Sequence, residues 1–168
     1  WINPTAHTAF TPAFFGAVDE HIPEGESVPS SDRWISFLPE GWDGNTMLWS
    51  GSETWVDATA GERIPRDTWS HMAVSVHNGQ VSAGLNGSEK CSGGKVPDYF
   101  SEGEGRFALG VNYWDTPLQA LIDELKVYDA ALTAEEVLAL DVENRPVEDL
   151  LDSAVNLLNL GDLSSVRS

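Results

Sequence analysis

Residues 69–85 read Trp-Ser-His-Met-Ala-Val-Ser-Val-His-Asn-Gly-Gln-Val-Ser-Ala-Gly-Leu, and this segment is the strongest indicator of the fold class. Apolar residues alternate with small or polar ones on both sides of Asn78-Gly79, a dipeptide that favours a two-residue β-hairpin turn. Because side chains alternate between the two faces of a strand, one face of the predicted hairpin is apolar and belongs in a core. The residues on that face are Met72, Val74, Val76, Val81, Ala83 and Leu85.

The rest of the first 128 residues also consists of short apolar segments separated by turn residues, which is typical of an all-β protein. Further strands are predicted at residues 1–3, 13–18, 33–38, 46–50, 54–58, 107–111 and 118–128.

The pattern changes to a helical one near the C-terminus. Thr133 with Glu136 three residues later predicts a capped helix start, and Pro146 ends this helix. A second helix is predicted from Val147, with apolar residues at helical spacing and a stop at Gly161.

The chain is strongly acidic, with 27 Asp and Glu against 9 Lys and Arg and a net charge of −18. Binding to nucleic-acid phosphates needs clustered cations, so we expect no nucleic-acid partner and no anionic membrane surface. No stretch approaches 18 consecutive apolar residues, so no membrane insertion is expected. The one cysteine, Cys91, cannot form an internal disulfide, and this favours a bacterial surface protein over an animal extracellular module.

Three segments resemble laminin-G-like domains of the concanavalin A-like lectin/glucanase superfamily, as these occur in bacterial carbohydrate-active proteins. The first is the hairpin extended through Asn86-Gly87, and the second is Leu-Gly-Val-Asn at 109–112. The third is the most specific: Ala-Leu-Ile-Asp-Glu-Leu-Lys-Val-Tyr at 120–128, then Ala-Leu-Thr-Ala-Glu-Glu at 131–136. It is similar to the closing strand and helix of the family, with Ala120 where the family often has Gly.

The resemblance implies an antiparallel jelly-roll β-sandwich over residues 1–141, with short C-terminal helices. Residues 142–168 are then expected to form a helical linker to a further module. The family's domain starts some strands before a segment like Trp-Ile-Asn-Pro at 1–4, so N-terminal strands of the sandwich are expected to be missing.

For function, the resemblance implies a non-catalytic carbohydrate-binding or accessory module of a multidomain extracellular bacterial glycoside hydrolase, with arabinose-releasing enzymes among the candidate parents. The expected partners are a polysaccharide or oligosaccharide and other domains of the same parent chain, outside the cell or at the bacterial surface. The alternative is a structural or protein-interaction spacer of a surface protein. The fold alone does not decide between them, because this sandwich serves lectins, enzymes and spacers alike.

A third hypothesis, an intrinsic hydrolase, ranks last because a catalytic constellation is not evident. Glycoside hydrolysis needs two carboxylates facing each other across the bond, whereas Asp123 and Glu124 point to opposite faces of their predicted strand. His71 and His77 lie on the hairpin without a Gly-x-Ser-x-Gly motif, so both are interpreted as sheet-face histidines.

Seven tryptophans exceed what the core of one small domain usually needs, and aromatic rings stack on the apolar faces of sugars. Trp34, Trp49 and Trp69 are predicted to serve the structure. The predicted sugar-binding residues lie where a ring neighbours an acid or amide: Trp42, Asp43, Trp55 (near Asp57), Asn112, Tyr113, Trp114 and Asp115. The alternative is that the loop rings fold back over the edge of the sandwich.

Calcium is the expected cofactor, again by resemblance. In related sandwiches the Asp of the closing strand binds a structural ion together with ligands from the first strands, which implies Asp123 as a metal ligand here. The alternative is that Asp123 caps loop backbone without a metal. The spacing of a zinc site is absent from the sequence.

Overall fold

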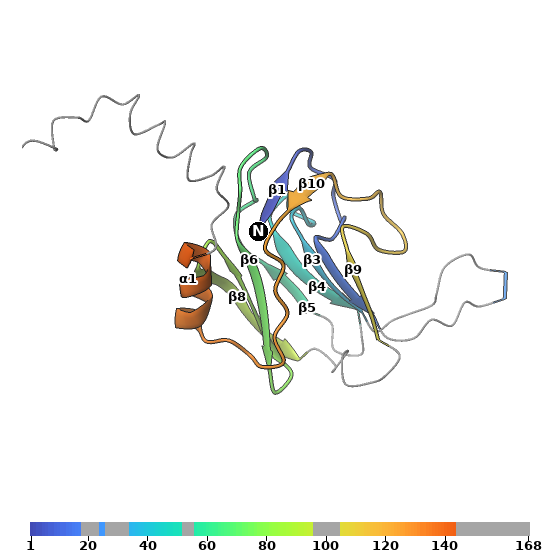
Figure 1. The fold of residues 1–168 in the computed structure, drawn as a ribbon. Helices are drawn as coiled ribbons and strands as arrows, with labels where there is room; N and C mark the ends of the chain where they lie inside the picture. Colours follow the sequence, from blue (N-terminus) through green and yellow to red (C-terminus); the bar gives the residue numbers. More distant parts are fainter. Residues whose placement is uncertain (18–23, 26–33, 52–55, 96–104, 144–168) are drawn as a thin grey trace, which may run out of the picture.

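The computed structural model describes residues 1–17, 24–25, 34–51, 56–95 and 105–143 (Figure 1). The strands are β1 (Ile2–Pro4), β2 (Phe14–Ala17), β3 (Trp34–Leu38), β4 (Met47–Gly51), β5 (Val56–Thr59), β6 (Met72–His77), β7 (Gln80–Leu85), β8 (Ser88–Lys95), β9 (Arg106–Leu109) and β10 (Ala120–Ile122), and the helix is α1 (Ala134–Glu143).

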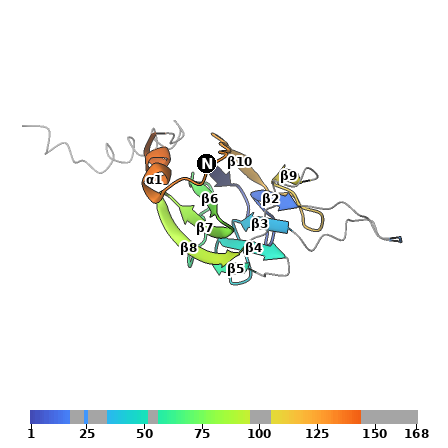
Figure 2. The ribbon, with the colours of Figure 1, turned by 90° about the horizontal axis from the view of Figure 1, so that it is seen from below.

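These strands form two layers that face each other (Figure 2). One layer is a five-stranded sheet in the order β5-β4-β3-β2-β9, and the other is a three-stranded sheet in the order β6-β7-β8. A short pair, β1-β10, joins them at one end, where Ile2 also bridges to Ser70 just before β6. All the pairings are antiparallel, so the predicted antiparallel β-sandwich is confirmed.

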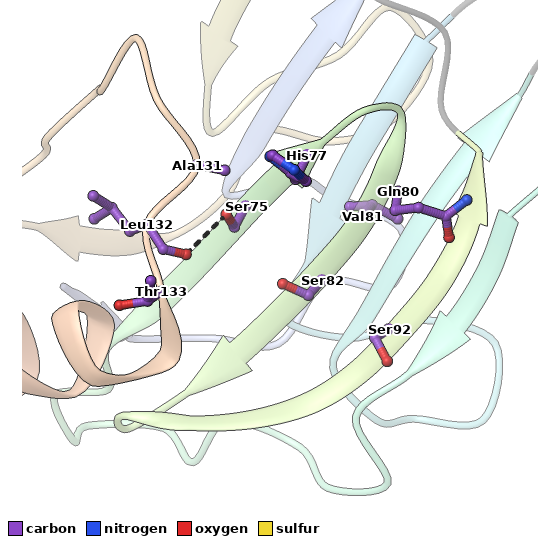
Figure 3. Close-up of a pocket in the computed structure, with 9 residues that line it drawn as sticks. All are labelled: Ser75, His77, Gln80, Val81, Ser82, Ser92, Ala131, Leu132 and Thr133. Carbon is purple, nitrogen blue, oxygen red and sulfur yellow. Dashed lines mark hydrogen bonds between the residues drawn. The ribbon is translucent and has the colours of Figure 1, made fainter.

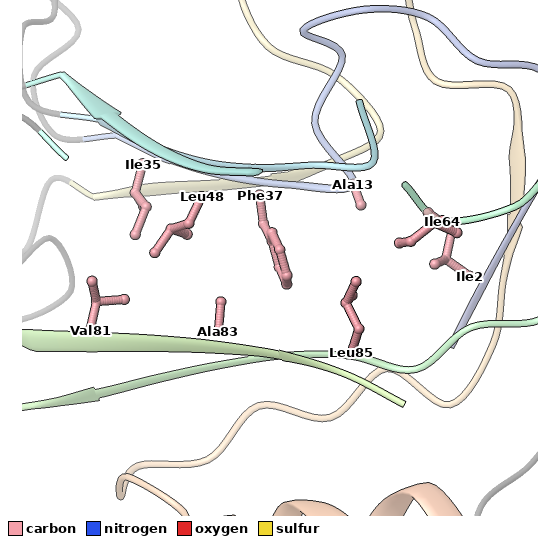
Figure 4. Close-up of a cluster of buried hydrophobic side chains, with 9 residues drawn as sticks. All are labelled: Ile2, Ala13, Ile35, Phe37, Leu48, Ile64, Val81, Ala83 and Leu85. Carbon is pink, nitrogen blue, oxygen red and sulfur yellow. The ribbon is translucent and has the colours of Figure 1, made fainter. Parts of the chain in front are cut away.

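The core lies between the two sheets (Figure 4). Ile35, Phe37 and Leu48 project from the five-stranded sheet toward Val81, Ala83 and Leu85 of β7, and all six are at most 3% exposed. The predicted hairpin is confirmed residue by residue, because β6 pairs Met72 with Leu85, Val74 with Ala83 and Val76 with Val81. Val76 differs from the other core-face residues, since 41% of it remains exposed.

The prediction of a long strand over 118–128 is wrong for this structure, which has a strand only over Ala120–Ile122. A strand is held by pairing with a neighbour, and β1 pairs with these three residues alone. Within the described ranges, no strand lies beside residues 123–128, and Leu125 and Val127 are 52% and 78% exposed. Residues 123–128 have no strand to pair with among the described residues, and this explains why they do not form a strand.

The predicted helix start is confirmed at Thr133. Its hydroxyl oxygen accepts a hydrogen bond from the Glu136 backbone N–H (3.3 Å), and the Glu136 carboxylate accepts one from the Thr133 N–H (2.8 Å). The second predicted helix, from Val147, lies outside the described residues. Within the described part of the chain, no helix combines the length and the apolar character needed to cross a membrane.

Candidate functional site

The face of the five-stranded sheet that points away from the core carries aromatic side chains from three neighbouring strands. Phe15, Trp34 and Trp49 alternate along β2, β3 and β4 with residues of the opposite, core-facing side. The rings of Trp34 and Trp49 meet edge to face, with centroids 4.7 Å apart and planes at 89°. The ring of Phe15 lies 6.4 Å from that of Trp34 on the other side.

Loop residues extend this arrangement at both ends into one aromatic row. The ring of Trp42 lies 5.0 Å from that of Trp49, and the ring of Trp114 lies 5.7 Å from that of Trp34. The aromatic row consists of Trp42, Phe10, Trp49, Trp34, Trp114, Phe15 and Tyr113. Within the row, Trp34 and Phe15 are buried, whereas Trp42 is 59% and Trp114 48% exposed. The row therefore presents two accessible indole rings supported by buried ones.

The loop that carries Trp114 is held by its own side chains. The Asn112 carboxamide oxygen accepts hydrogen bonds from the backbone N–H groups of Trp114 (2.9 Å) and Asp115 (2.8 Å), and its NH₂ group donates to the Asp115 carboxylate (2.6 Å). The Thr11 hydroxyl, on a different loop, donates to the carbonyl of Thr116 (2.6 Å). These contacts hold the backbone of the loop that carries Trp114.

The loop that carries Trp42 is organised in the same way. The Asp43 carboxylate accepts hydrogen bonds from the backbone and side-chain nitrogens of Asn45 (both 3.0 Å) and from the Thr59 hydroxyl (3.3 Å). These hydrogen bonds, those from Asn45 first, hold the pKa of Asp43 below its ordinary value. Asp43 is therefore a stable negative charge beside an exposed indole ring.

Phe10 contacts both loops, since its carbonyl accepts a hydrogen bond from the Asn112 side chain (3.5 Å), and it was not predicted from the sequence. Its ring lies 4.8 Å from that of Trp42 and 6.0 Å from that of Trp49, and its backbone N–H donates to the carbonyl of Glu40 (2.9 Å). Its φ of +65° is unusual for a residue with a side chain and costs roughly 1 kcal/mol. The sequence offers no signal for Phe10, because an isolated Phe in a loop has no pattern that marks it.

The structure brings most of the predicted sugar-binding residues to one surface. Trp42 and Asp43 lie at one end of the aromatic row, and the loop from Asn112 to Asp115 lies at the other. Trp55 lies outside the described residues, and of Asp57 only the backbone is described, opposite Trp49 in the neighbouring strand. Trp34 and Trp49, which the sequence assigned to the structure alone, form the floor that joins the two ends.

This arrangement suits a ligand with flat apolar faces and many hydroxyl groups. Exposed indole rings stack on the C–H faces of sugars, and carboxylates beside them accept hydrogen bonds from sugar hydroxyls. The ring separations of 5.0, 4.7 and 5.7 Å along Trp42, Trp49, Trp34 and Trp114 limit the distance between the two exposed rings to roughly 15 Å.

A hollow of mixed polar and apolar lining lies on the three-stranded sheet (Figure 3). Its volume is about 520 Å³, and Ser75, Ser82 and Ser92 line it from three adjacent strands. Residues 131–133 form its other wall, where the Ser75 hydroxyl donates to the carbonyl of Leu132 (3.3 Å). The described residues that line it include no Trp, Tyr or Phe, so they offer a sugar no stacking surface comparable to the aromatic row.

Asp123, the predicted calcium ligand, lies beside the N-terminal residue of the chain. Its backbone N–H donates to the carbonyl of Trp1 (3.1 Å), and its carboxylate accepts a hydrogen bond from the Glu124 N–H (2.9 Å). Among the described residues, no group of three His, Cys, Asp or Glu side chains comes together as a metal site. Calcium also takes backbone carbonyl ligands, and its binding at Asp123 stays a prediction.

Comparisons with known proteins agree with this fold. Residues 1–138 match the Laminin_G_3 family, described as the concanavalin A-like lectin/glucanases superfamily. Among solved structures, the chain is similar to domain 4 of AbnA, a GH43 extracellular arabinanase from Geobacillus stearothermophilus. That structure is a complex with arabinotriose. The sequence identity is 48% and the TM-score is 0.73. The match covers 84% of this chain and 63% of the arabinanase domain, so the chain spans less than two thirds of that neighbour's length. A search of curated proteins gave no match. The chain belongs to the concanavalin A-like lectin/glucanase superfamily.

Proposed function

We propose that this domain is a non-catalytic carbohydrate-binding module that binds arabinose-containing oligosaccharides or polysaccharides through the aromatic row. The observation that carries the proposal is the pair of exposed indole rings, Trp42 and Trp114, held by buried aromatic residues and fixed loops on one sheet face. The arabinotriose in the complex of the 48% identical arabinanase domain supports the choice of sugar.

The proposal extends to the parent protein. Because the similar domain is part of an extracellular arabinanase, we propose that this module belongs to an extracellular bacterial glycoside hydrolase and holds its catalytic domain near the polysaccharide. The expected partners are therefore the glycan and the other domains of that chain.

The test is glycan binding by the purified chain. Isothermal titration calorimetry with arabinotriose, and affinity electrophoresis in gels containing linear arabinan, should both detect binding. Trp114→Ala and Trp42→Ala should each weaken it about tenfold, because each removes a stacking surface for the sugar. The same samples should release no reducing sugar from arabinan, since the proposed module is non-catalytic.

Tyr128→Ala is the matched control, because Tyr128 is 47% exposed, like Trp114 at 48%, and lies outside the aromatic row. It should bind as the unaltered chain does. Circular dichroism should show that all variants are folded. A folded chain that binds none of these glycans would refute the proposal and favour the alternative of a spacer module.

A further inference from the structure

The exposed ring of Trp42 is supported from two directions. Its centroid lies 4.8 Å from that of Phe10 and 5.0 Å from that of Trp49, and both rings meet it edge to face, at 63° and 69°. Phe10 and Trp49 lie 6.0 Å from each other, so the three rings form a closed triangle. Among the described residues, these two rings are the ones that contact Trp42. Without the Phe10 ring, Trp49 alone would hold the indole of Trp42.

The other exposed ring of the aromatic row, that of Trp114, is supported without the Phe10 ring. It lies 5.5–6.0 Å from the rings of three other aromatic residues, which are Phe15, Trp34 and Tyr113. Phe10 reaches the loop of Trp114 through its backbone, because its carbonyl accepts a hydrogen bond from the Asn112 side chain (3.5 Å). Removal of the Phe10 ring therefore affects the two ends of the row unequally.

Phe10 adopts a backbone conformation that disfavours a bulky side chain. Its φ of +65° lies in the left-handed region, where Cβ comes too close to the following carbonyl oxygen. The Phe10 backbone N–H donates to the carbonyl of Glu40 (2.9 Å), just ahead of the loop that carries Trp42. Glycine would adopt this conformation without strain, so a Phe here has a cost that its ring contacts must offset. Strained residues of this kind cluster where proteins hold ligands.

The ring contacts of Phe10 belong to the aromatic row and not to the core. Phe10 is half-buried, and it is not among the described residues that fill the space between the two sheets. Its ring contacts are Trp42 and Trp49, which both lie in the row. Loss of the Phe10 ring should therefore change the surface of the row more than it changes the fold.

We propose that Phe10 is a positioning residue of the carbohydrate site, whose ring fixes the orientation in which the Trp42 indole stacks on the sugar. This inference rests on the function proposed above for the aromatic row. Phe10 acts through Trp42 and does not itself contact the ligand. Phe10 and Trp42 then form one unit at one end of the row, and Trp114 binds the ligand independently of the Phe10 ring.

The test is a double-mutant cycle, measured with arabinotriose by titration calorimetry and with linear arabinan by affinity electrophoresis. Phe10→Ala removes the ring and should weaken binding by the unaltered chain about threefold. In the Trp42→Ala background it should cause no further loss, because the indole that Phe10 positions is absent. In the Trp114→Ala background the loss of about threefold should persist.

Two further variants separate positioning from a general structural effect. Phe10→Tyr retains the ring and should bind as the unaltered chain does. Phe107→Ala is the matched control, because Phe107 is 43% exposed and contacts the ring of Phe14 (5.0 Å) outside the row, and it should leave binding unchanged. Equal losses from Phe10→Ala in all three backgrounds would overturn the inference. So would equal weakening by Phe10→Tyr and Phe10→Ala.

A second measurement needs no ligand. Fluorine NMR of the chain labelled with fluorotryptophan resolves the indoles, and the Trp42 and Trp114 resonances are assigned by their loss in Trp42→Ala and Trp114→Ala. Phe10→Ala should shift and broaden the Trp42 resonance and leave that of Trp114 in place. An unchanged Trp42 resonance would overturn the inference. A shifted Trp42 resonance in a chain that binds neither glycan would instead refute the proposed function, and the role of Phe10 in binding with it.

Discussion

At the scale of single residues, Trp34 is the pivot of the aromatic row. Its ring contacts those of Phe15, Trp49 and Trp114. It therefore joins the buried ring of Phe15 to the exposed ring of Trp114. The ring lies directly across the backbone of Gly51 on the neighbouring strand, where an added Cβ would stand 2.4 Å from the indole nitrogen. A glycine is needed here for close approach rather than for its backbone freedom.

Gly51→Ala should therefore displace the ring of Trp34 within the aromatic row. The new methyl group forces the Trp34 ring to shift, which should cost about 1–3 kcal/mol of stability and weaken arabinan binding through displaced Trp114. Denaturant unfolding and calorimetric titration measure the two effects. Trp34→Phe in the same background provides a smaller ring and should recover part of the stability. A double variant no more stable than Gly51→Ala alone would contradict this account.

His71 gives a second residue-level prediction, for pH. Burial lowers the pKa of His71 below 6.5, and the positive charges of the Trp1 amino group and Lys126 lower it further. The carboxylate of Asp141, 3.8 Å away, acts in the opposite direction. Because the unfolded chain then binds the proton more readily, stability should be full above pH 6.5 and fall as the pH drops below it.

The measurement is the free energy of unfolding between about pH 7.5 and pH 5, across the ordinary titration range of His. His71→Gln should flatten the decline, whereas His77→Gln, at an exposed position of β6, should leave it unchanged. A decline of the same size in all three proteins would assign it to other groups.

At the scale of secondary-structure elements, the sequence predicted best where strands pair locally. The β6–β7 hairpin has strict alternation and an Asn-Gly turn, so its turn and its strand register could be read from 17 residues, although β6 begins at Met72 rather than at the predicted Trp69. β8 was not predicted, because Ser88–Lys95 is polar and rich in Gly and is held as a strand by pairing with β7. The strand predicted at 118–128 shows the converse case, since a favourable pattern does not make a strand without a partner.

The helix start can be tested separately. Thr133→Ala removes the hydroxyl that caps α1 and should destabilise the protein by about 1 kcal/mol, seen as a lower midpoint in denaturant unfolding. Thr133→Ser keeps the hydroxyl and should retain most of the stability. If the two variants are equally destabilised, the methyl group of Thr133 rather than its capping hydrogen bond supports the helix.

At the scale of the whole molecule, the site is assembled from segments far apart in the sequence. Phe10, Trp42 and Trp114 come from three loops that the five-stranded sheet brings to one face. The sequence could indicate Trp42 and Trp114 by their acidic and amide neighbours, but not that buried Trp34 and Trp49 join them. The continuity of the aromatic row depends on the order of the strands in the sheet. For example, β9 (106–109) pairs with β2 (14–17), and the local sequence pattern does not reveal this pairing.

The net charge of −18 leads to a prediction for the molecule as a whole. Like charges repel in the compact state, and salt screens them over a Debye length of about 10 Å at 0.1 M. Raising NaCl from about 0.01 to 0.3 M should therefore raise the thermal midpoint by several degrees. Binding of arabinotriose should change little over the same range, because the sugar is uncharged.

Scanning calorimetry and titration calorimetry at matched salt concentrations measure the two responses. A midpoint that falls with salt would mean that attractive pairs, such as Lys90–Glu62 at 2.8 Å and Arg63–Glu40 at 3.3 Å, outweigh the general repulsion. Affinity that falls steeply with salt would mean that charge, rather than stacking on the exposed indole rings, holds the ligand. That result would contradict the aromatic row as the binding surface, because stacking on an uncharged sugar is insensitive to screening.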